Sequence, residues 1–416
     1  MNFQYLRPHK AECAKSEWDN YLDRTHQLTI QHFANVKLTA MGQCPGIEPG
    51  ENRFIDDCDF YSEIVETNEE IAKIAGNVLY AGYFRLSWGH FLMNSTARLW
   101  PLFTSGDIYD KIVFFCESDE IPVLKGNFLE FFRLLGIEKK CVFLSPSVYE
   151  FEKITIGEIA LEIGRYYSSE FMLPFEAIKK KVHETAGEKT EIVKGIILSR
   201  SNWNDNQSVQ LNVKSIENTF ITNGYKPVSP ETTSLSDLIT LMDSAACIVS
   251  FSGSTAHNIL FAENKKLIVL ERCAANNIYQ IGIAKMTGGE YVPIDCFYQP
   301  LLVSSTDNLT VYAFTSQFKS FVSEYGMELP EDDNTDLKQE FKKLLTIFRR
   351  RYGYGVGLNS WEVPQFPAIA EAYFESYQRY GKYLERQVPV MWFDWFSPRV
   401  YIRMLRNLLK QAQKTK

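Results

Sequence analysis

The sequence predicts an α/β protein of two domains followed by a helical extension. Short, unbroken apolar runs alternate with amphipathic segments, as expected for strands buried in a parallel sheet and the helices that cover it. The chain has 416 residues, too many for one hydrophobic core. A polar connector at 186–195 divides the alternation into two blocks. We therefore place the domains at 1–188 and 189–305, and the extension at 306–416.

The first block predicts an α/β domain. The run KIVFFC at 111–116 is its clearest buried strand, and a turn-rich loop occupies 44–54. Further strands are expected at 78–84, 141–144 and 153–156, and helices at 62–75, 88–103, 122–135 and 175–185.

The second block predicts a doubly wound parallel sheet. Strands are expected at 195–199, 225–228, 247–251, 267–270 and 291–294, and helices at 213–223, 235–245, 256–262 and 277–286. Ser234 stands where the second of these helices needs an N-cap.

Composition narrows the class of protein. The formal net charge of −7 argues against nucleic-acid binding. The eight cysteines are widely spaced without a CxxC pair, which is typical of a reduced cytoplasmic protein rather than a disulfide framework or a zinc site. The start of the chain lacks the apolar core of a signal peptide, and no run reaches the length of a membrane span. We therefore expect a cytoplasmic location.

The segment 388–416 differs in kind from the rest of the chain. An aromatic cluster around Trp392 and Trp395 precedes a helical pattern of basic residues with apolar residues between them. A basic amphipathic helix beside tryptophans is typical of contact with an anionic membrane, here the inner face of the cytoplasmic membrane. The alternative is a terminal helix that packs on the first domain with its basic face in solvent.

A candidate anion site lies at 246–270, ACIVSFSGSTAHNILFAENKKLIVL, which reads as strand, turn, short helix and strand. The turn leaves the carboxyl end of a strand, so its backbone N–H groups face outward from the sheet edge. Gly253 allows close approach, and Ser254 and Thr255 add hydroxyl donors, which suits a phosphate or pyrophosphate. The alternative is a crossover whose small residues only allow close helix–strand packing.

A candidate proton acceptor lies at 83–103, YFRLSWGHFLMNSTARLWPLF. His90 would stand at a helix start, with Asn94 and Arg98 one and two turns further along the same face. A histidine placed there can take a proton from an acceptor hydroxyl. A lone histidine can equally be a structural hydrogen-bonding residue, and this alternative stays open.

Taken together, these stretches resemble glycosyltransferase family 61. The segment WGHFLMNSTARLW at 88–100 is similar to the family's WGHFLLDxLPRLW. The LSR at 198–200, the segment 230–261 and the LIVLE at 267–271 follow in the family's order and spacing, and Asn277 and Tyr279 match its N-x-Y. The resemblance covers roughly 78–300 and is specific as an ordered set.

The resemblance implies a GT-B architecture, in which two Rossmann-like domains face one another across a cleft. The donor, a nucleotide sugar that we expect to be UDP-linked, would lie mainly on the second domain. The acceptor, a glycan or lipid-linked glycan of a growing capsule, lipopolysaccharide or exopolysaccharide, would lie on the first. The family inverts the anomeric centre by direct displacement without a metal held by a DxD motif. Asp57-Cys58-Asp59 lies outside the match, and we expect a solvated loop there.

Roles for individual residues follow from the resemblance. The donor's pyrophosphate would be held by the fork of Arg200 and by the turn residues Gly253, Ser254 and Thr255. Asn258 would hold the turn or the donor, and Glu271 would accept hydrogen bonds from ribose hydroxyls. His90 would be the catalytic base or would orient the acceptor.

The chain departs from the family pattern in several places. The family's aspartate is replaced by Asn94, so a histidine–aspartate pair cannot operate. The usual HGAxLTN reads SGSTAHN, and the second arginine and the NE that commonly follow the SR are missing. Trp88, Trp100 and Trp203 could stack on sugars, although core packing suits Trp100 better.

Two other functions stay open. A non-catalytic protein of the same fold would bind a nucleotide sugar or glycan and scaffold a polysaccharide assembly complex. A phosphotransferase would bind a nucleoside triphosphate with magnesium, for which the sequence offers no suitable carboxylate pair.

Overall fold

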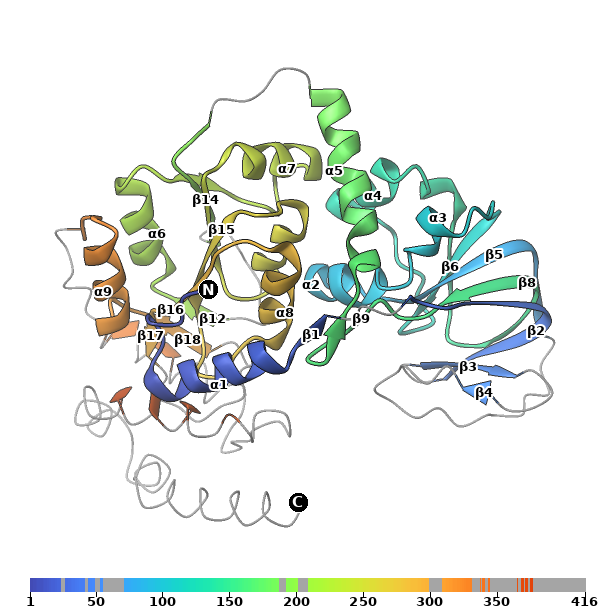
Figure 1. Cartoon of the computed structure of the whole chain (residues 1–416), viewed down its shortest axis with the longest axis horizontal. Helices are drawn as coiled ribbons and strands as arrows, with labels where there is room; N and C mark the ends of the chain where they lie inside the picture. The colour runs from blue at the N-terminus through green and yellow to red at the C-terminus, as the bar shows by residue number, and fades with distance from the viewer. Residues whose placement is uncertain are drawn as a thin grey trace, which may run out of the picture.

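The computed structural model describes most of the chain up to residue 330. The described residues are 1–23, 27–41, 44–48, 53–54, 71–186, 192–200, 209–298 and 309–330, with 337, 339–340, 343–344, 365, 368–369, 371–372 and 375–376. Two bodies lie side by side, one around a large mixed sheet and the other around a parallel sheet (Figure 1). The predicted α/β class is thereby confirmed.

The first body is organised around a seven-stranded sheet with the order β4-β3-β2-β8-β5-β6-β7. Its pairings are parallel from β8 to β7 and antiparallel from β4 to β8. The strands are β2 (Ile30–Met41), β3 (Cys44–Glu48), β4 (Arg53–Phe54), β5 (Ala72–Phe84), β6 (Lys111–Cys116), β7 (Cys141–Leu144) and β8 (Val148–Gly157).

Alternate residues of the central strands face two apolar clusters. Leu79 and Phe114 pack with the phenylalanines of the covering helices, whereas Val78 and Tyr80 pack on the opposite face of the sheet. The helical segments of this body are α2 (Trp88–His90), the π-turn η1 (Phe91–Ser95), α3 (Pro101–Thr104), α4 (Gly126–Leu134), η2 (Glu138–Lys140), η3 (Ser169–Met172) and α5 (Leu173–Ala186). A small sheet joins β1 (Leu22–Asp23), β10 (Tyr166–Tyr167) and β9 (Leu161–Glu162).

The second body contains a five-stranded, fully parallel sheet with the order β13-β11-β14-β15-β16. In chain order this is 2-1-3-4-5, so the winding reverses between β11 and β14. The strands are β11 (Ile196–Leu198), β13 (Lys226–Val228), β14 (Cys247–Phe251), β15 (Lys266–Glu271) and β16 (Tyr291–Asp295). Every residue of β14 and β16 is buried, as unbroken apolar runs predict for strands covered on both faces.

Helices and a small sheet surround these strands. The helices are α6 (Val213–Thr222), α7 (Leu235–Ser244), the 3₁₀ segment η4 (Ala256–Phe261), α8 (Ile278–Thr287) and α9 (Ser316–Glu324). The small sheet has the order β12 (Val209–Leu211), β18 (Leu309–Tyr312), β17 (Phe297–Tyr298). Ser234 caps α7 as predicted, since its hydroxyl accepts a hydrogen bond from the Asp237 amide at 3.1 Å.

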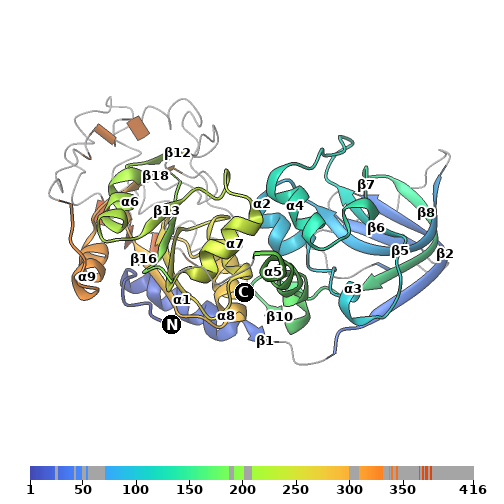
Figure 2. The same ribbon diagram turned by 90° about the horizontal axis from the view of Figure 1, so that it is seen from above.

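The two bodies share one apolar core where α4 and α5 meet α7 and η4 (Figure 2). Phe175 of α5 contacts both Phe131 and Phe261, with ring centroids 6.1 and 5.2 Å apart. The carboxylate of Glu130 accepts hydrogen bonds from the Leu235 and Ser236 amides at 2.7 and 3.0 Å. These contacts fix how the two sheets face each other.

The start of the chain belongs to the second body, which corrects its assignment to the first domain. Helix α1 (Pro8–Asn20) lies beside α8 and away from the seven-stranded sheet (Figure 1). The Asn2 amide donates to the Tyr291 carbonyl, and the Asp295 amide donates to the Tyr5 carbonyl, each at 3.0 Å. Local periodicity cannot reveal this pairing because its partners lie almost 300 residues apart.

Three predicted helices need correction. The expected helix at 88–103 is broken into α2, η1 and α3. Pro101 begins α3, at the first helical position, where a proline is tolerated. The described end of the expected helix at 62–75 is strand, since β5 begins at Ala72. The extension expected to be helical from 306 contains β18 as well as α9. The predictions for 388–416, Trp203 and Asp57–Asp59 lie outside the described residues.

Candidate functional site

The carboxyl edge of the parallel sheet gathers polar residues where the winding reverses. Arg200 follows β11, and Ser252 and Gly253 follow the neighbouring strand β14. In doubly wound sheets, ligands bind outside the carboxyl ends of the strands at this switch point. The fold therefore brings Arg200 and the turn together at the position where such sheets bind ligands.

The turn presents backbone donors. Ser252 and Gly253 are buried, Ser254 is exposed and Thr255 is half-buried. Gly253 has a φ of +120°, which strongly favours glycine. Within the part of the chain that the structure describes, the N–H groups of Gly253, Ser254 and Thr255 meet no hydrogen-bond acceptor, whereas the next N–H, that of Ala256, bonds to the Gly253 carbonyl. Successive unpaired N–H groups of this kind form a concavity that suits an anion.

The helix that follows the turn contributes less than expected. The segment η4 is a six-residue 3₁₀ helix rather than an α-helix, so few aligned peptide dipoles point at the turn. The positive charge of the site comes instead from arginine side chains.

A second arginine, Arg272, lies against the turn and was missed in the sequence. A Cβ added to Gly253 would lie 3.6 Å from Cζ and from both terminal nitrogens of the Arg272 guanidinium, so the guanidinium lies over the glycine. Burial raises the pKa of Tyr312, and the positive charges of Arg200 and Arg272 both oppose that rise, because both lie near this side chain. Arg200 and Arg272, which follow the strands on either side of β14, therefore both lie near Tyr312.

Arg200 is held at its strand end by a buried carboxylate. Glu217 of α6 accepts a hydrogen bond from the Arg200 amide at 2.7 Å and another from the Ser199 hydroxyl at 3.0 Å. These hydrogen bonds fix the backbone of Arg200 at the end of β11. They do not determine where its guanidinium points, which depends on other contacts.

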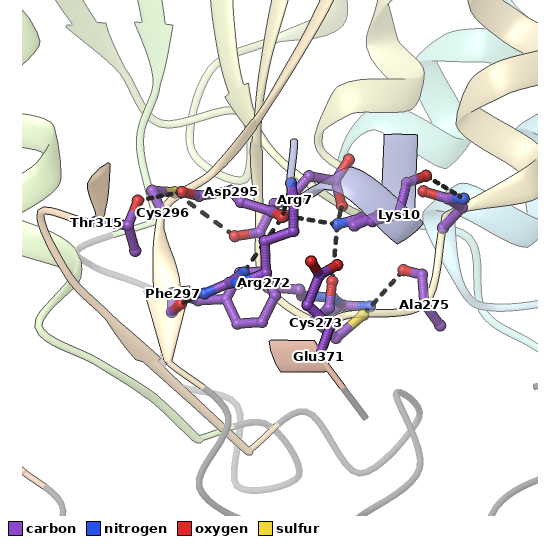
Figure 3. Close-up of polar contacts among 12 residues, drawn as sticks. Arg7, Lys10, Arg272, Cys273, Ala275, Asp295, Cys296, Phe297, Thr315 and Glu371 are labelled. Carbon is purple, nitrogen blue, oxygen red and sulfur yellow. Dashed lines mark hydrogen bonds and ion pairs between the residues drawn. The ribbon is translucent and has the colours of Figure 1, made fainter. Parts of the chain in front are cut away.

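Glu271 is not open to a ribose, which corrects the role expected for it. Its carboxylate is buried and lies 3.2 Å from the ammonium of Lys10, which also contacts Asp295 (Figure 3). Helix α1 covers this end of β15 and β16, and a donor's ribose cannot reach the carboxylate without displacing Lys10.

On the first body, His90 lies at the carboxyl end of β5, in α2. Its Nδ1 lies 3.1 Å from Oδ1 of Asn94. When the amide oxygen accepts this hydrogen bond, Nδ1 carries the proton and Nε2 keeps a lone pair that can accept one. Arg98 does not share this site, because its guanidinium is buried and donates to the Gly157 carbonyl.

The two turns touch each other. The indole N–H of Trp88 donates to Oδ1 of Asn258 at 2.8 Å, and the Asn258 amide donates to the Thr255 carbonyl at 2.8 Å. Asn258 therefore holds the turn and ties it to the first body. A Cβ on Gly89 would lie 2.6 Å from Oγ of Ser254, so a side chain at this position would force Ser254 to move.

An aromatic cluster completes the junction. Tyr279 of α8 stacks on His257 with ring centroids 6.1 Å apart and meets His90 edge-on at 5.7 Å. Trp88 is half-buried and stacks on Phe91, and Trp100 is buried with its indole N–H on the Glu158 carbonyl. Trp100 is therefore a core residue.

Across the described ranges, no cluster of three or more His, Cys, Asp or Glu side chains is arranged to hold a metal ion. In the same ranges, no helix combines the length and apolar character needed to cross a bilayer.

Fold and site together define an α/β protein whose doubly wound sheet brings an arginine and a glycine turn to the carboxyl ends of its strands. Residues 88–269 match the family model described as Glycosyltransferase 61. The matched segment begins at the Trp88 turn and ends within β15, so it contains both turns described above. This match confirms the resemblance to glycosyltransferase family 61 over that segment. A comparison with curated proteins gave no match.

Proposed function

We propose that this protein is an inverting glycosyltransferase that moves a sugar from a nucleoside-diphosphate donor to a hydroxyl of a growing surface polysaccharide. One observation carries the proposal: the Arg272 guanidinium lies over Gly253, in a turn whose N–H groups meet no acceptor among the described residues. Arg200 follows the neighbouring strand, and His90 of the other body contacts Tyr279 nearby. The two sheets would then act as the halves of a GT-B enzyme, with the donor on the second body.

The donor's diphosphate would lie against Gly253, between the two arginines. When the bond to the sugar breaks, its electron pair stays on the diphosphate oxygen, and negative charge develops there. Guanidinium groups and fixed N–H donors stabilise such charge best where it appears, because they need no reorganisation during the reaction. This arrangement favours a donor with two phosphates, and a UDP-linked sugar is the first to test.

The acceptor would approach from the first body. Its hydroxyl oxygen would attack the anomeric carbon from the face opposite the diphosphate, which inverts that centre. His90 Nε2 would take the hydroxyl proton, while the Asn94 contact keeps Nδ1 protonated. Because the neutral Asn94 cannot balance the imidazolium that forms, we expect a slower proton transfer than an aspartate partner would allow.

The acceptor is proposed to be a glycan or lipid-linked glycan of a capsule, lipopolysaccharide or exopolysaccharide. The tail at 388–416, outside the described residues, would hold the enzyme at the anionic inner face of the cytoplasmic membrane. If so, a chain lacking this segment should fail to sediment with anionic vesicles that carry down the full chain.

A non-catalytic, scaffolding protein of the same fold is the second candidate. The contact between Gly89 and Ser254 favours it, because the two turns already touch there: a Cβ on Gly89 would lie 2.6 Å from Oγ of Ser254. Such a protein would bind the donor at the same arginines without transferring the sugar.

An activity assay separates the two candidates. We expect hydrolysis or transfer from one member of a panel of nucleotide sugars, with turnover abolished by Arg200→Ala. His90→Ala should lower turnover while nucleotide binding persists. Lys194→Ala is the matched control, because this lysine contacts the Asn223 carbonyl at the opposite edge of the sheet. Nucleotide binding without any turnover would favour the scaffolding protein, and an unchanged rate in His90→Ala would remove His90 from the chemistry.

A further inference from the structure

A buried lysine of α1 lies at the carboxyl ends of β15 and β16. Lys10 is 1% exposed, and its ammonium lies 3.2 Å from Oε2 of Glu271, 3.0 Å from Oδ1 of Asp295 and 2.8 Å from the Cys273 carbonyl (Figure 3). An ammonium carries three hydrogens, so these contacts use all of its donors. Lys10 thus joins α1 to two neighbouring strand ends.

The contacts of Lys10 bracket Arg272. Glu271 immediately precedes this arginine and Cys273 immediately follows it. Between them, the Arg272 carbonyl accepts a hydrogen bond from the Thr310 hydroxyl at 2.8 Å. The backbone of Arg272 is therefore fixed at its own carbonyl and on both sides, at the place from which its guanidinium reaches over Gly253.

Stability alone does not account for this arrangement. Burial by itself lowers the pKa of Lys10, but the nearby carboxylates of Asp295 and Glu271 outweigh it, so the pKa is raised and the lysine stays charged. Buried ion pairs of this kind often contribute no more stability than well-packed apolar side chains of the same volume, because desolvation offsets the attraction. What apolar side chains cannot supply is directed hydrogen bonds: two from Lys10 hold the segment that carries Arg272, and the third ties it to Asp295 of β16.

We propose that Lys10 is a positioning residue for Arg272, and through it for the diphosphate of the donor. The inference rests on the proposed function. It makes α1 part of the donor site, although this helix lies outside the segment 88–269 that matches the family.

A double-mutant cycle tests the inference. The dissociation constant is measured by calorimetry for UDP, or for the nucleoside diphosphate that binds the wild type most tightly, in wild type, Lys10→Met, Arg272→Gln and the double variant. Each single variant should bind about tenfold more weakly, the loss expected for one charge-assisted hydrogen bond. Because Lys10 acts through Arg272, adding Lys10→Met to Arg272→Gln should change the dissociation constant little further. Two losses that multiply would show that Lys10 only supports the fold, and would overturn the inference.

Two further variants keep the test decisive. Lys285→Met is the matched control, because Lys285 donates to the Trp18 and Tyr21 carbonyls at the other end of α1. It should lower the melting temperature and leave nucleotide affinity unchanged. If Lys10→Met does not fold, Thr310→Val replaces it in the test, because this substitution removes only the hydrogen bond to the Arg272 carbonyl. It should weaken nucleotide binding in the wild-type background and have no further effect in the Arg272→Gln background. Unchanged affinity in that variant would also overturn the inference. A wild type that binds no nucleoside diphosphate would instead contradict the proposed function.

Discussion

At the scale of single residues, His257 shows that the junction between the two turns is shielded from solvent. Its ring is 5% exposed, stacks on Tyr279 and lies under Gly89. Burial lowers the pKa of His257 to about 3, and the Gly89 backbone opposes the shift only in part. The ring is therefore neutral at physiological pH, and the positive charge beside the turn belongs to Arg272.

This histidine predicts how stability depends on pH. Below about pH 6.5 His257 is protonated in the unfolded chain, whereas in the folded chain it stays neutral down to about pH 3. The free energy of unfolding that is present above pH 6.5 is therefore progressively lost as the pH falls through this range. The loss is about 1.4 kcal/mol for each pH unit in that window. Urea unfolding at pH 7.5 and pH 5 should show a smaller pH effect in His257→Gln than in wild type. The exposed His9→Gln is the control, and equal pH effects in wild type and His257→Gln would contradict the prediction.

The sequence predicts residues whose role follows from local position and misses those defined by distant partners. Arg200 stands at the end of a recognisable strand, and Gly253 stands in a recognisable turn. Arg272 follows the next strand with no motif of its own, and only the parallel register of β14 and β15 places it over Gly253. Glu271 was expected to contact a ribose, but its carboxylate is paired with Lys10. The sequence could not reveal this pair because the two residues are 261 positions apart.

At the scale of elements, α7 depends on both bodies for its first turn. Ser234 caps it locally, and Glu130 of α4 accepts hydrogen bonds from two further amides and from the Ser236 hydroxyl at 2.6 Å. A carboxylate at a helix N-terminus accepts hydrogen bonds from N–H groups that have no partner within the helix. Its negative charge also interacts favourably with the positive end of the helix dipole. The same helix therefore joins the two sheets and supports the start of β14.

Removal of this carboxylate should loosen the junction. We expect Glu130→Ala to lower the free energy of unfolding by about 1–2 kcal/mol, similar to the loss of an N-cap. Glu138→Ala is the matched control, because Glu138 pairs with Arg133 on the exposed side of the same segment and should contribute little. Chemical denaturation measures both variants, and equal stability of the two would contradict the importance of the cap.

Elements with a strong local signal were predicted well. The strand expected at 247–251 is β14, because an apolar run between two helices leaves no other assignment. The helix expected at 88–103 is interrupted. The sequence did not show this, because a buried chain bend surrounded by apolar residues has the same apolar pattern as a continuous buried helix. His90 lies in the first of these short segments, where its ring meets Tyr279 edge-on.

At the scale of the whole molecule, two sheets meet through one core, and the carboxyl ends of β5 and β14 lead into turns that touch. The Trp88–Asn258 hydrogen bond and the Gly89–Ser254 contact bring His90 to the edge that carries Arg200 and Arg272. Helix α1 closes the neighbouring part of that edge. Composition and alternation could predict two α/β blocks, but not that the first twenty residues complete the second block.

The proposed donor site is tested most directly by a calorimetric titration of nucleoside diphosphates and their monophosphates into the intact chain and into Arg200→Ala. One diphosphate should bind the wild type more tightly than its monophosphate, because only the diphosphate engages both arginines. Arg200→Ala should lose about tenfold or more of that affinity, as for a charge-assisted contact. Binding that is equal for the two nucleotides, or unaffected by Arg200→Ala, would contradict the proposed site.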